Sequence, residues 1–153
     1  MGREKFNRTI FFISLLLSFI CGCSDSDDSN SSATTLPQIL NKTWKLQRYG
    51  KSGEGNKLAS STQITIIFNE DNTVRGSGGC NTYGANFDID SAGTLSVKNL
   101  FSTEMACLTP GALEQETLYF QVLQEVTTYE LASDSLKLFY DAAKSSLIFQ
   151  TSE

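Results

Sequence analysis

The stretch Gly79-Cys80-Asn81-Thr82-Tyr83-Gly84, together with the later Met105-Ala106-Cys107, carries most of the fold information in this chain of 153 residues. Glycines that interrupt a strand-like pattern mark bulges, sharp bends or close backbone approach. We therefore predict a strand that begins at Thr73, a bend over residues 79–84, and a second strand over residues 86–89. A bend of this kind can present polar side chains such as Asn81 and Tyr83.

Cys80 and Cys107 are the two cysteines that lie beyond the N-terminal leader and the expected anchor residue Cys23. Outside the cytoplasm such a pair tends to oxidise, and we favour a disulfide between them. Two thiols in a chain without histidine are too few for a structural zinc site, so no metal is expected. Buried free thiols and a reactive cysteine remain as alternatives; the latter needs an electropositive setting, which the nearby Glu104 does not favour.

Outward from this block, the sequence shows the period-two alternation of half-buried strands. Trp44 and Leu46 alternate with Lys45 and Gln47, for example. The further strands are predicted over residues 43–49, 63–68, 94–100, 128–131, 135–140 and 146–150. Residues 88–93 look faintly like the start of a calcium loop, but the ligand set fails and a hairpin turn is expected there.

One segment changes to helical spacing. Thr109 is predicted to cap a helix and Pro110 to occupy its first turn. An apolar stripe for packing against a sheet is formed by Leu113, Phe120, Leu123 and Val126, with Ala112 and Tyr119 beside them. Taken together, the elements predict a mainly β (α+β) domain: a small antiparallel β-barrel-like fold of about eight strands with one packed α-helix.

Residues 1–22 have the pattern of a lipoprotein signal peptide. A basic start precedes an apolar run that is shorter than the roughly 20 residues needed to span a bilayer. Ile20-Cys21-Gly22-Cys23 resembles a bacterial lipobox, so Cys23 is the expected lipidation site and the expected link to a membrane. An ordinary cleaved signal with a free thiol is the alternative.

Residues 23–35 are predicted to form the lipidated cysteine and a flexible acidic tether, because they offer no apolar core residue. An acidic run directly behind a lipidated cysteine also resembles the surface-export signal of some Gram-negative lipoproteins. Whether this segment is a plain tether or an export signal, we expect a lipid-anchored protein of the bacterial cell envelope. The outer membrane is favoured, and the sequence does not distinguish its periplasmic face from the cell surface. Metal binding by Asp25, Asp27 and Asp28 is disfavoured, since nothing rigid holds those carboxylates.

Charge and composition narrow the function further. The net charge is −5, and removal of the basic leader makes the remainder more acidic. Such a surface repels phosphate backbones, so nucleic-acid binding is not expected. The chain contains no histidine, which excludes Ser-His-Asp and Cys-His catalysis. No cofactor motif is apparent, and we expect no enzymatic activity.

These blocks, in this order, resemble the META/HslJ family over residues 36–153. The resemblance rests on Thr43-Trp44-Lys45-Leu46, residues 76–84 with Phe87, Thr103-Glu104-Met105-Ala106-Cys107, and the helix from Glu114 to Leu123. It implies a compact β-barrel-like domain, often on a lipid anchor. Members are loosely tied to heat induction, antibiotic tolerance, or secretion and motility, and no catalytic mechanism accompanies the fold.

The sequence thus predicts a non-catalytic envelope protein that acts as a binding or stress-related module with an envelope protein partner. Asn81 and Tyr83 are the candidate binding residues, although a purely architectural role at the bend is favoured for both. Two other functions stay open. The barrel mouth could carry a small molecule, or the loop over residues 50–61 could inhibit a secreted protease.

Overall fold

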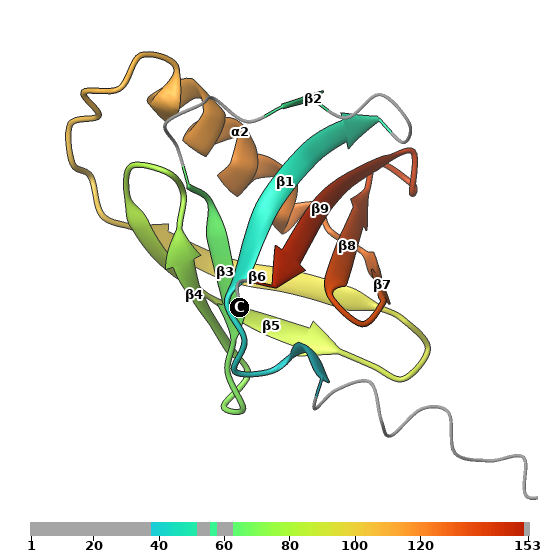
Figure 1. Ribbon diagram of the computed structural model, residues 1–153. Helices are drawn as coiled ribbons and strands as arrows, with labels where there is room; N and C mark the ends of the chain where they lie inside the picture. Colours follow the sequence, from blue (N-terminus) through green and yellow to red (C-terminus); the bar gives the residue numbers. More distant parts are fainter. Residues whose placement is uncertain (1–37, 52–55, 58–62, 152–153) are drawn as a thin grey trace, which may run out of the picture.

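A computed structural model describes residues 38–51, 56–57 and 63–151 (Figure 1). The predicted signal peptide, Cys23 and the tether lie outside these residues. A helical turn at residues 38–39 precedes the sheet. The elements are β1 (Trp44–Lys51), β2 (Asn56–Lys57), β3 (Thr65–Phe68), β4 (Thr73–Ser77), β5 (Thr82–Ile89), β6 (Leu95–Ser102), α2 (Ala112–Gln124), β7 (Thr128–Leu131), β8 (Ser135–Tyr140) and β9 (Ser145–Thr151).

All the paired strands belong to one antiparallel sheet. Its order is β6-β5-β4-β3-β1-β9-β8-β7, and the short β2 pairs with β1 outside this path. The sheet curls until its two edge strands meet at one corner. There Thr94 forms a bridge with Thr128, and the Leu95 N–H donates to the Thr127 carbonyl at 3.0 Å. The result is a partly closed barrel, which confirms the predicted fold class.

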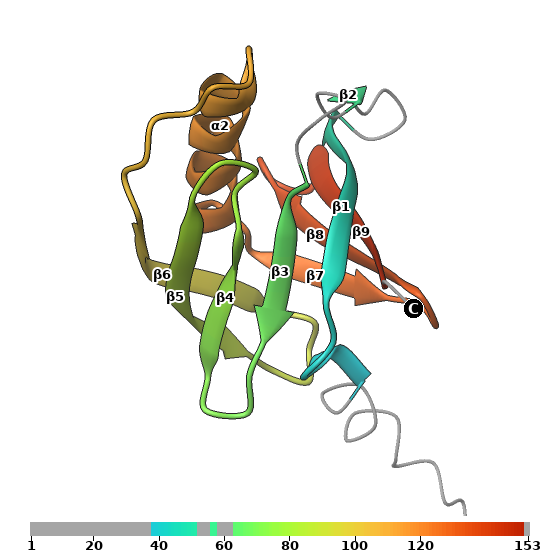
Figure 2. The same cartoon turned by 60° about the vertical axis from the view of Figure 1, so that its left-hand side comes forward.

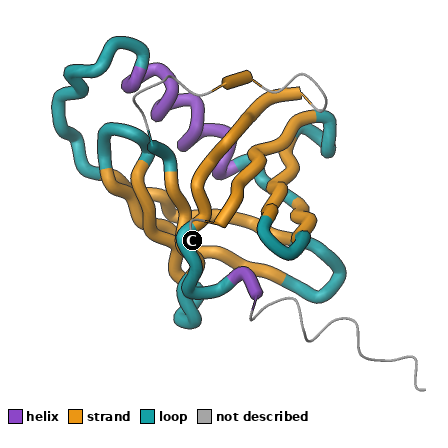
Figure 3. Tube along the Cα trace, viewed as in Figure 1, coloured by secondary structure: helices purple, strands orange, loops and turns teal. Residues whose placement is uncertain are grey.

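Helix α2 lies across the remaining opening of the curl, as Figures 1 and 2 show and the colouring of Figure 3 makes plain. Its inner face buries Tyr119, Val122 and Leu123. Tyr119 and Val122 line one interior gap together with Leu46, Ile64 and Leu147 from the sheet. Trp44, also fully buried, donates its Nε1–H to the Ile39 carbonyl at 3.0 Å, which satisfies the indole inside the core.

The expected elements are present, with three differences. The bend is shorter than predicted, because Tyr83 and Gly84 already lie within β5. Helix α2 begins at Ala112 with Gly111 as its N-cap at φ 78°, and no side chain caps it, so the prediction for Thr109 and Pro110 is wrong. A positive φ suits glycine at this position, whereas threonine would be strained there.

The third difference concerns Leu113, which was assigned to the apolar stripe but is 54% exposed. It lies in the first turn of α2, beside segment 103–106. Ala112, Tyr119, Leu123 and Val126 are buried as predicted, and Phe120 is partly buried.

Among the described residues, no helix is both long enough and apolar enough to cross a membrane.

Candidate functional site

The bend between β4 and β5 is where three distant parts of the chain meet. Gly79 takes φ 109°, a conformation that L-residues rarely adopt. Gly78 lies so close to helix α2 that a Cβ there would come within 2.6 Å of the Glu116 Oε2 and of the Phe120 ring. The two adjacent glycines therefore have different roles: one turns the chain, and the other lets the helix approach.

Glu116, from the second turn of α2, binds this bend through its carboxylate. Oε2 accepts the backbone N–H groups of Cys80 at 3.1 Å and of Asn81 at 2.6 Å, and Oε1 accepts the Asn81 Nδ2–H at 2.6 Å. Glu116 is only 3% exposed. A buried carboxylate needs several donors to offset its lost hydration, and the bend supplies three.

Asn81 connects the same bend to the segment that follows β6. Its Oδ1 accepts the Thr103 hydroxyl at 2.9 Å and the Met105 backbone N–H at 2.7 Å. The Asn81 side-chain amide thus donates its Nδ2–H to Glu116 on helix α2 and accepts, at Oδ1, from Thr103 and Met105 in the segment after β6. With Glu116 it forms what we call the polar latch: Asn81, Glu116, and the backbone groups of Cys80 and Met105.

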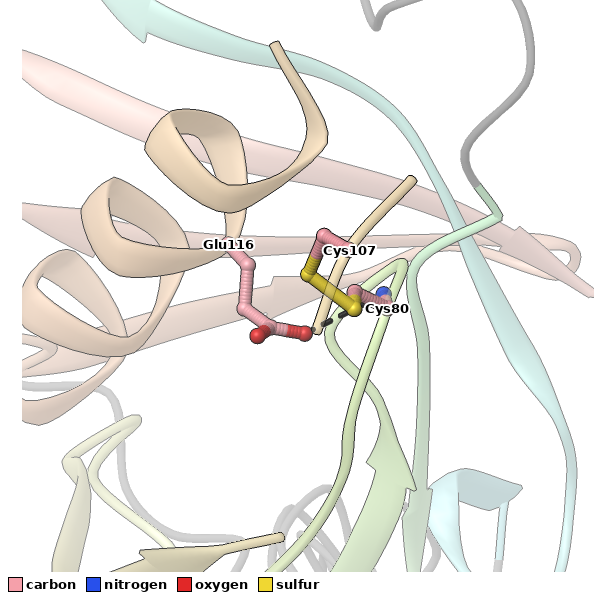
Figure 4. A group of neighbouring side chains, drawn as sticks. All are labelled: Cys80, Cys107 and Glu116. Atoms are coloured by element: carbon pink, nitrogen blue, oxygen red, sulfur yellow. Dashed lines mark hydrogen bonds between the residues drawn. A yellow bond between two sulfur atoms is a disulfide. The ribbon is translucent and has the colours of Figure 1, made fainter. Parts of the chain in front are cut away.

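A disulfide between Cys80 and Cys107 lies against the polar latch (Figure 4). The prediction of this pairing is confirmed. The figure shows the two sulfur atoms beside the Glu116 carboxylate, with the Cys80 backbone N–H directed to that carboxylate. Segment 103–107 is therefore held to the bend twice, covalently at Cys107 and by hydrogen bonds at Thr103 and Met105.

Tyr83 and Tyr119 form a second buried polar contact inside the curl. Their hydroxyl oxygens are 2.6 Å apart, and the Tyr83 hydroxyl donates to the Thr65 carbonyl at 3.1 Å. Tyr119 then donates to Tyr83. Burial raises the pKa of both phenols, that of Tyr83 well above its ordinary value, because the phenolate would lose its hydration in the core.

Among the described residues, Cys80, Cys107 and Glu116 are the one group of three side chains close enough to hold a metal ion. In the disulfide, however, the sulfur atoms are not thiolates, and thiolate is the form that binds metal. The Glu116 carboxylate is also occupied by three N–H donors. This donor set does not suit a metal ion while the disulfide is intact.

The two candidate binding residues are both interior. Asn81 is 3% exposed and Tyr83 is 4% exposed, and the polar atoms of both side chains are engaged within the chain. Their contacts are those of the architectural reading that the sequence left open. The sequence pattern did not single out Glu116 or indicate its contact with Asn81. The available signal was its position one turn before Tyr119, on the buried side of α2.

The outer surface carries two hollows beside the polar latch. The sheet-face hollow, about 470 Å³, lies over β4, β5 and the end of β6 and includes Arg75, Gly84 and Phe101. The helix-side hollow, about 430 Å³, lies between segment 103–106 and helix α2 and includes Met105, Leu113 and Phe120. Both hollows include Ser102 and Thr103, so the end of β6 separates them.

The interior offers less room. The gap beneath Leu46, Ile64, Tyr119 and Leu147 does not admit a water-sized sphere, so no ligand-sized space is found at this place in the curl. Most of the loop over residues 50–61, proposed from the sequence as an inhibitory segment, lies outside the described residues.

The fold is that of a small, curled antiparallel sheet closed by a single helix. Residues 37–153 match the family model of the META domain, and the chain belongs to that family. No curated protein matches this chain.

Two solved structures illustrate the similarity. The NMR structure of a protein from Burkholderia xenovorans is 25% identical, with a TM-score of 0.62 over 76% of this chain and 85% of that one. A DUF4847 family protein from Bacteroides vulgatus ATCC 8482 is 17% identical, with a TM-score of 0.57 over 73% of this chain and 93% of that one, and supports the fold alone. Neither description states an activity.

Proposed function

We propose that this protein is a non-catalytic, lipid-anchored component of the bacterial cell envelope that binds a protein partner through the helix-side hollow. The observation that carries the proposal is a group of apolar side chains that the fold exposes there. Met105 is 60% exposed and Leu113 is 54% exposed, and both line the hollow with the partly buried Phe120. Exposed apolar patches with polar surroundings are characteristic of interaction surfaces.

The polar latch favours binding because it orders both sides of this surface in advance. The Met105 backbone is held by Asn81, and Leu113 stands one turn before Glu116 on α2. An ordered surface loses less conformational entropy when a partner docks. Leu108, on the same connecting segment, is 94% exposed and extends the apolar surface available to a protein.

Two further observations argue against catalysis and for an anchor. The whole chain lacks histidine, and the buried Glu116 is surrounded by donors of the chain itself. Cys23 follows a signal-like segment and precedes an acidic stretch that can act as a tether between membrane and domain.

The binding proposal is tested by affinity capture from envelope extract with the full-length protein in non-ionic detergent. The wild type should capture one saturable partner that untagged protein competes away. The double variant Met105→Glu/Leu113→Glu should lose this partner, because two carboxylates in the hollow would be desolvated on docking. The control Leu118→Glu alters an exposed residue of the same helix outside the hollow and should retain it. Capture that survives the double variant contradicts the proposal.

The anchor is tested separately. Mass spectrometry of the mature protein should show a diacylglyceryl group on Cys23, and Cys23→Ser should move the protein from the membrane pellet to the soluble fraction. An unmodified N-terminus, or membrane retention of the variant, would contradict lipidation.

A further inference from the structure

The sheet-face hollow combines an aromatic ring, a cation and a glycine floor in one row across three strands. Arg75 on β4 pairs with Gly84 on β5, and Gly84 pairs with Phe101 on β6. Side chains that pair in this way point to the same face of a sheet. Because the central residue has no side chain, the Phe101 ring can lie over it, with Arg75 on the other side of the glycine.

Phe101 makes a flat, accessible platform at one end of this row. A Cβ on Gly84 would lie 2.5 Å from the Phe101 Cζ and 3.0 to 3.1 Å from two further ring atoms, so the ring leans over the glycine. It is nevertheless 70% exposed. The ring therefore covers the floor with one side and offers the other side to a ligand, and an exposed aromatic face is a strong apolar contact surface.

Arg75 supplies charge at the other end. The side chain is exposed, and the ion pairs among the described residues are Lys98 with Asp88 and Lys137 with Glu130. Arg75 has no carboxylate partner within that part of the chain. A guanidinium presents a planar fork of donors that matches a carboxylate in two parallel hydrogen bonds. In a chain with net charge −5, this cation is a local attraction for one anionic group.

Hydroxyl and amide groups complete the rim. Thr82 and Asn86 are exposed on β5 on either side of Gly84. Thr73 on β4 pairs with Asn86, and its hydroxyl already donates to Asp71 and accepts from Asn69. The volume of the hollow, about 470 Å³, is in the range of small-molecule sites. A ligand that uses every part of this surface needs a ring with an apolar face, several hydroxyl groups and one acid.

We propose that the sheet-face hollow binds a saccharide that carries a single carboxylate, with its sugar ring on Phe101 and its acid on Arg75. A neutral sugar would leave the guanidinium without a partner, and a fatty acid would make no use of the exposed polar groups of Thr82 and Asn86. A polyanion would meet a single cation among the residues that line the hollow. A nucleotide shares the stacking requirement, but its phosphate carries more charge than one guanidinium neutralises.

The test uses two matched probes, cellobiouronic acid and cellobiose, which differ by one carboxylate in place of a hydroxymethyl group. The full-length protein in deuterated non-ionic detergent is titrated with each probe by ligand-observed NMR. We expect the acid to bind about tenfold more tightly, as one charge-assisted contact would provide. Equal affinities, or no saturable binding of the acid, would overturn the proposal, and so would tighter binding of adenosine monophosphate.

Variants separate the two contacts. Arg75→Gln should bring the two affinities within about twofold of each other, because it removes only the charge. Phe101→Ala should weaken both probes by about fivefold and preserve their ratio, because stacking does not depend on the acid. Both side chains are exposed, so the fold should be retained. Arg48→Gln, an exposed arginine on β1 outside the hollow, is the control and should change neither affinity.

The helix-side surface is tested independently. Met105→Glu/Leu113→Glu should leave the saccharide affinities unchanged, since neither residue lines the sheet-face hollow. Loss of saccharide binding in that variant, together with retention in Arg75→Gln, would place the ligand in the other hollow and overturn this assignment.

Discussion

The carboxylate of Glu116 receives both the backbone N–H and the side-chain Nδ2–H of Asn81, each at 2.6 Å, across 35 residues of sequence. This double contact joins helix α2 to the bend between β4 and β5. It also explains why an asparagine stands at this position. An amide can donate to Glu116 and accept from Thr103 and Met105 at the same time, whereas a carboxylate could only accept.

Glu116→Gln should destabilise the fold by about 2 kcal/mol. The glutamine oxygen can replace one carboxylate oxygen, but its NH₂ group would then face a donor from the bend and leave it unsatisfied. Urea unfolding monitored by circular dichroism measures the change. Glu114→Gln, at an exposed position two residues earlier on the same helix, is the matched control and should lie within about 0.5 kcal/mol of wild type. Equal stability of the two variants would show that the latch contributes little.

The disulfide should contribute roughly 3–4 kcal/mol to stability in the chain-entropy model, because it closes a loop between residues 27 positions apart. The double variant Cys80→Ser/Cys107→Ser should lose about this amount in urea unfolding. Intact mass after alkylation, with and without prior reduction, establishes the oxidation state. Alkylation of both cysteines in unreduced native protein would contradict the disulfide.

Two glycines of neighbouring strands should respond differently to alanine. At Gly76 a Cβ would lie 2.0 Å from the Thr65 carbonyl oxygen, which belongs to a paired strand and cannot move aside. Gly76→Ala should therefore destabilise by about 2–3 kcal/mol. At Gly84 the three atoms nearest to the added Cβ belong to the exposed Phe101 ring, which can swing outward, so Gly84→Ala should stay within about 1 kcal/mol. Thermal unfolding of both variants measures the two losses of stability. A larger loss in Gly84→Ala than in Gly76→Ala would contradict these contacts.

The buried tyrosine pair predicts alkaline instability. In the folded protein the pKa values of Tyr83 and Tyr119 are raised, whereas in the unfolded chain they titrate near their ordinary value of about 10. Below that pH both states keep these protons and stability is unaffected. Above it the unfolded state loses them first, so the free energy of unfolding falls as pH rises, by up to about 1.4 kcal/mol per pH unit for each tyrosine.

Tyr119→Phe should make the free energy of unfolding fall less steeply with pH above about pH 10, because one of the two buried phenols is removed. Tyr129 and Tyr140 also have raised pKa values through burial, but they are common to both proteins and cancel in the comparison. Urea unfolding between pH 8 and about pH 11 gives the slope. An unchanged slope in Tyr119→Phe would indicate that this hydroxyl does not keep its proton in the folded state.

Local sequence pattern determined much of this protein. The alternation of Trp44 and Leu46, and of Leu136 and Leu138, places them in strands because every second strand residue faces one side, and all four are buried. The disulfide between Cys80 and Cys107 was inferred from the expected location outside the cytoplasm, where thiol pairs oxidise. A zinc site was excluded because the chain has no histidine and only these two thiols in the domain. The start of helix α2 was misjudged, because Gly111 adopts a backbone conformation that the preceding Thr109-Pro110 pair does not reveal.

The tertiary structure alone decided the contacts between distant segments. Glu116 meets Asn81 because α2 packs against the bend, and Phe101 covers Gly84 because the irregular register of β5 and β6 pairs these two residues. Strand and helix periodicity records which side of an element is buried but not which element lies opposite. The two surface hollows depend on those pairings, so the sequence contained their residues without indicating their assembly.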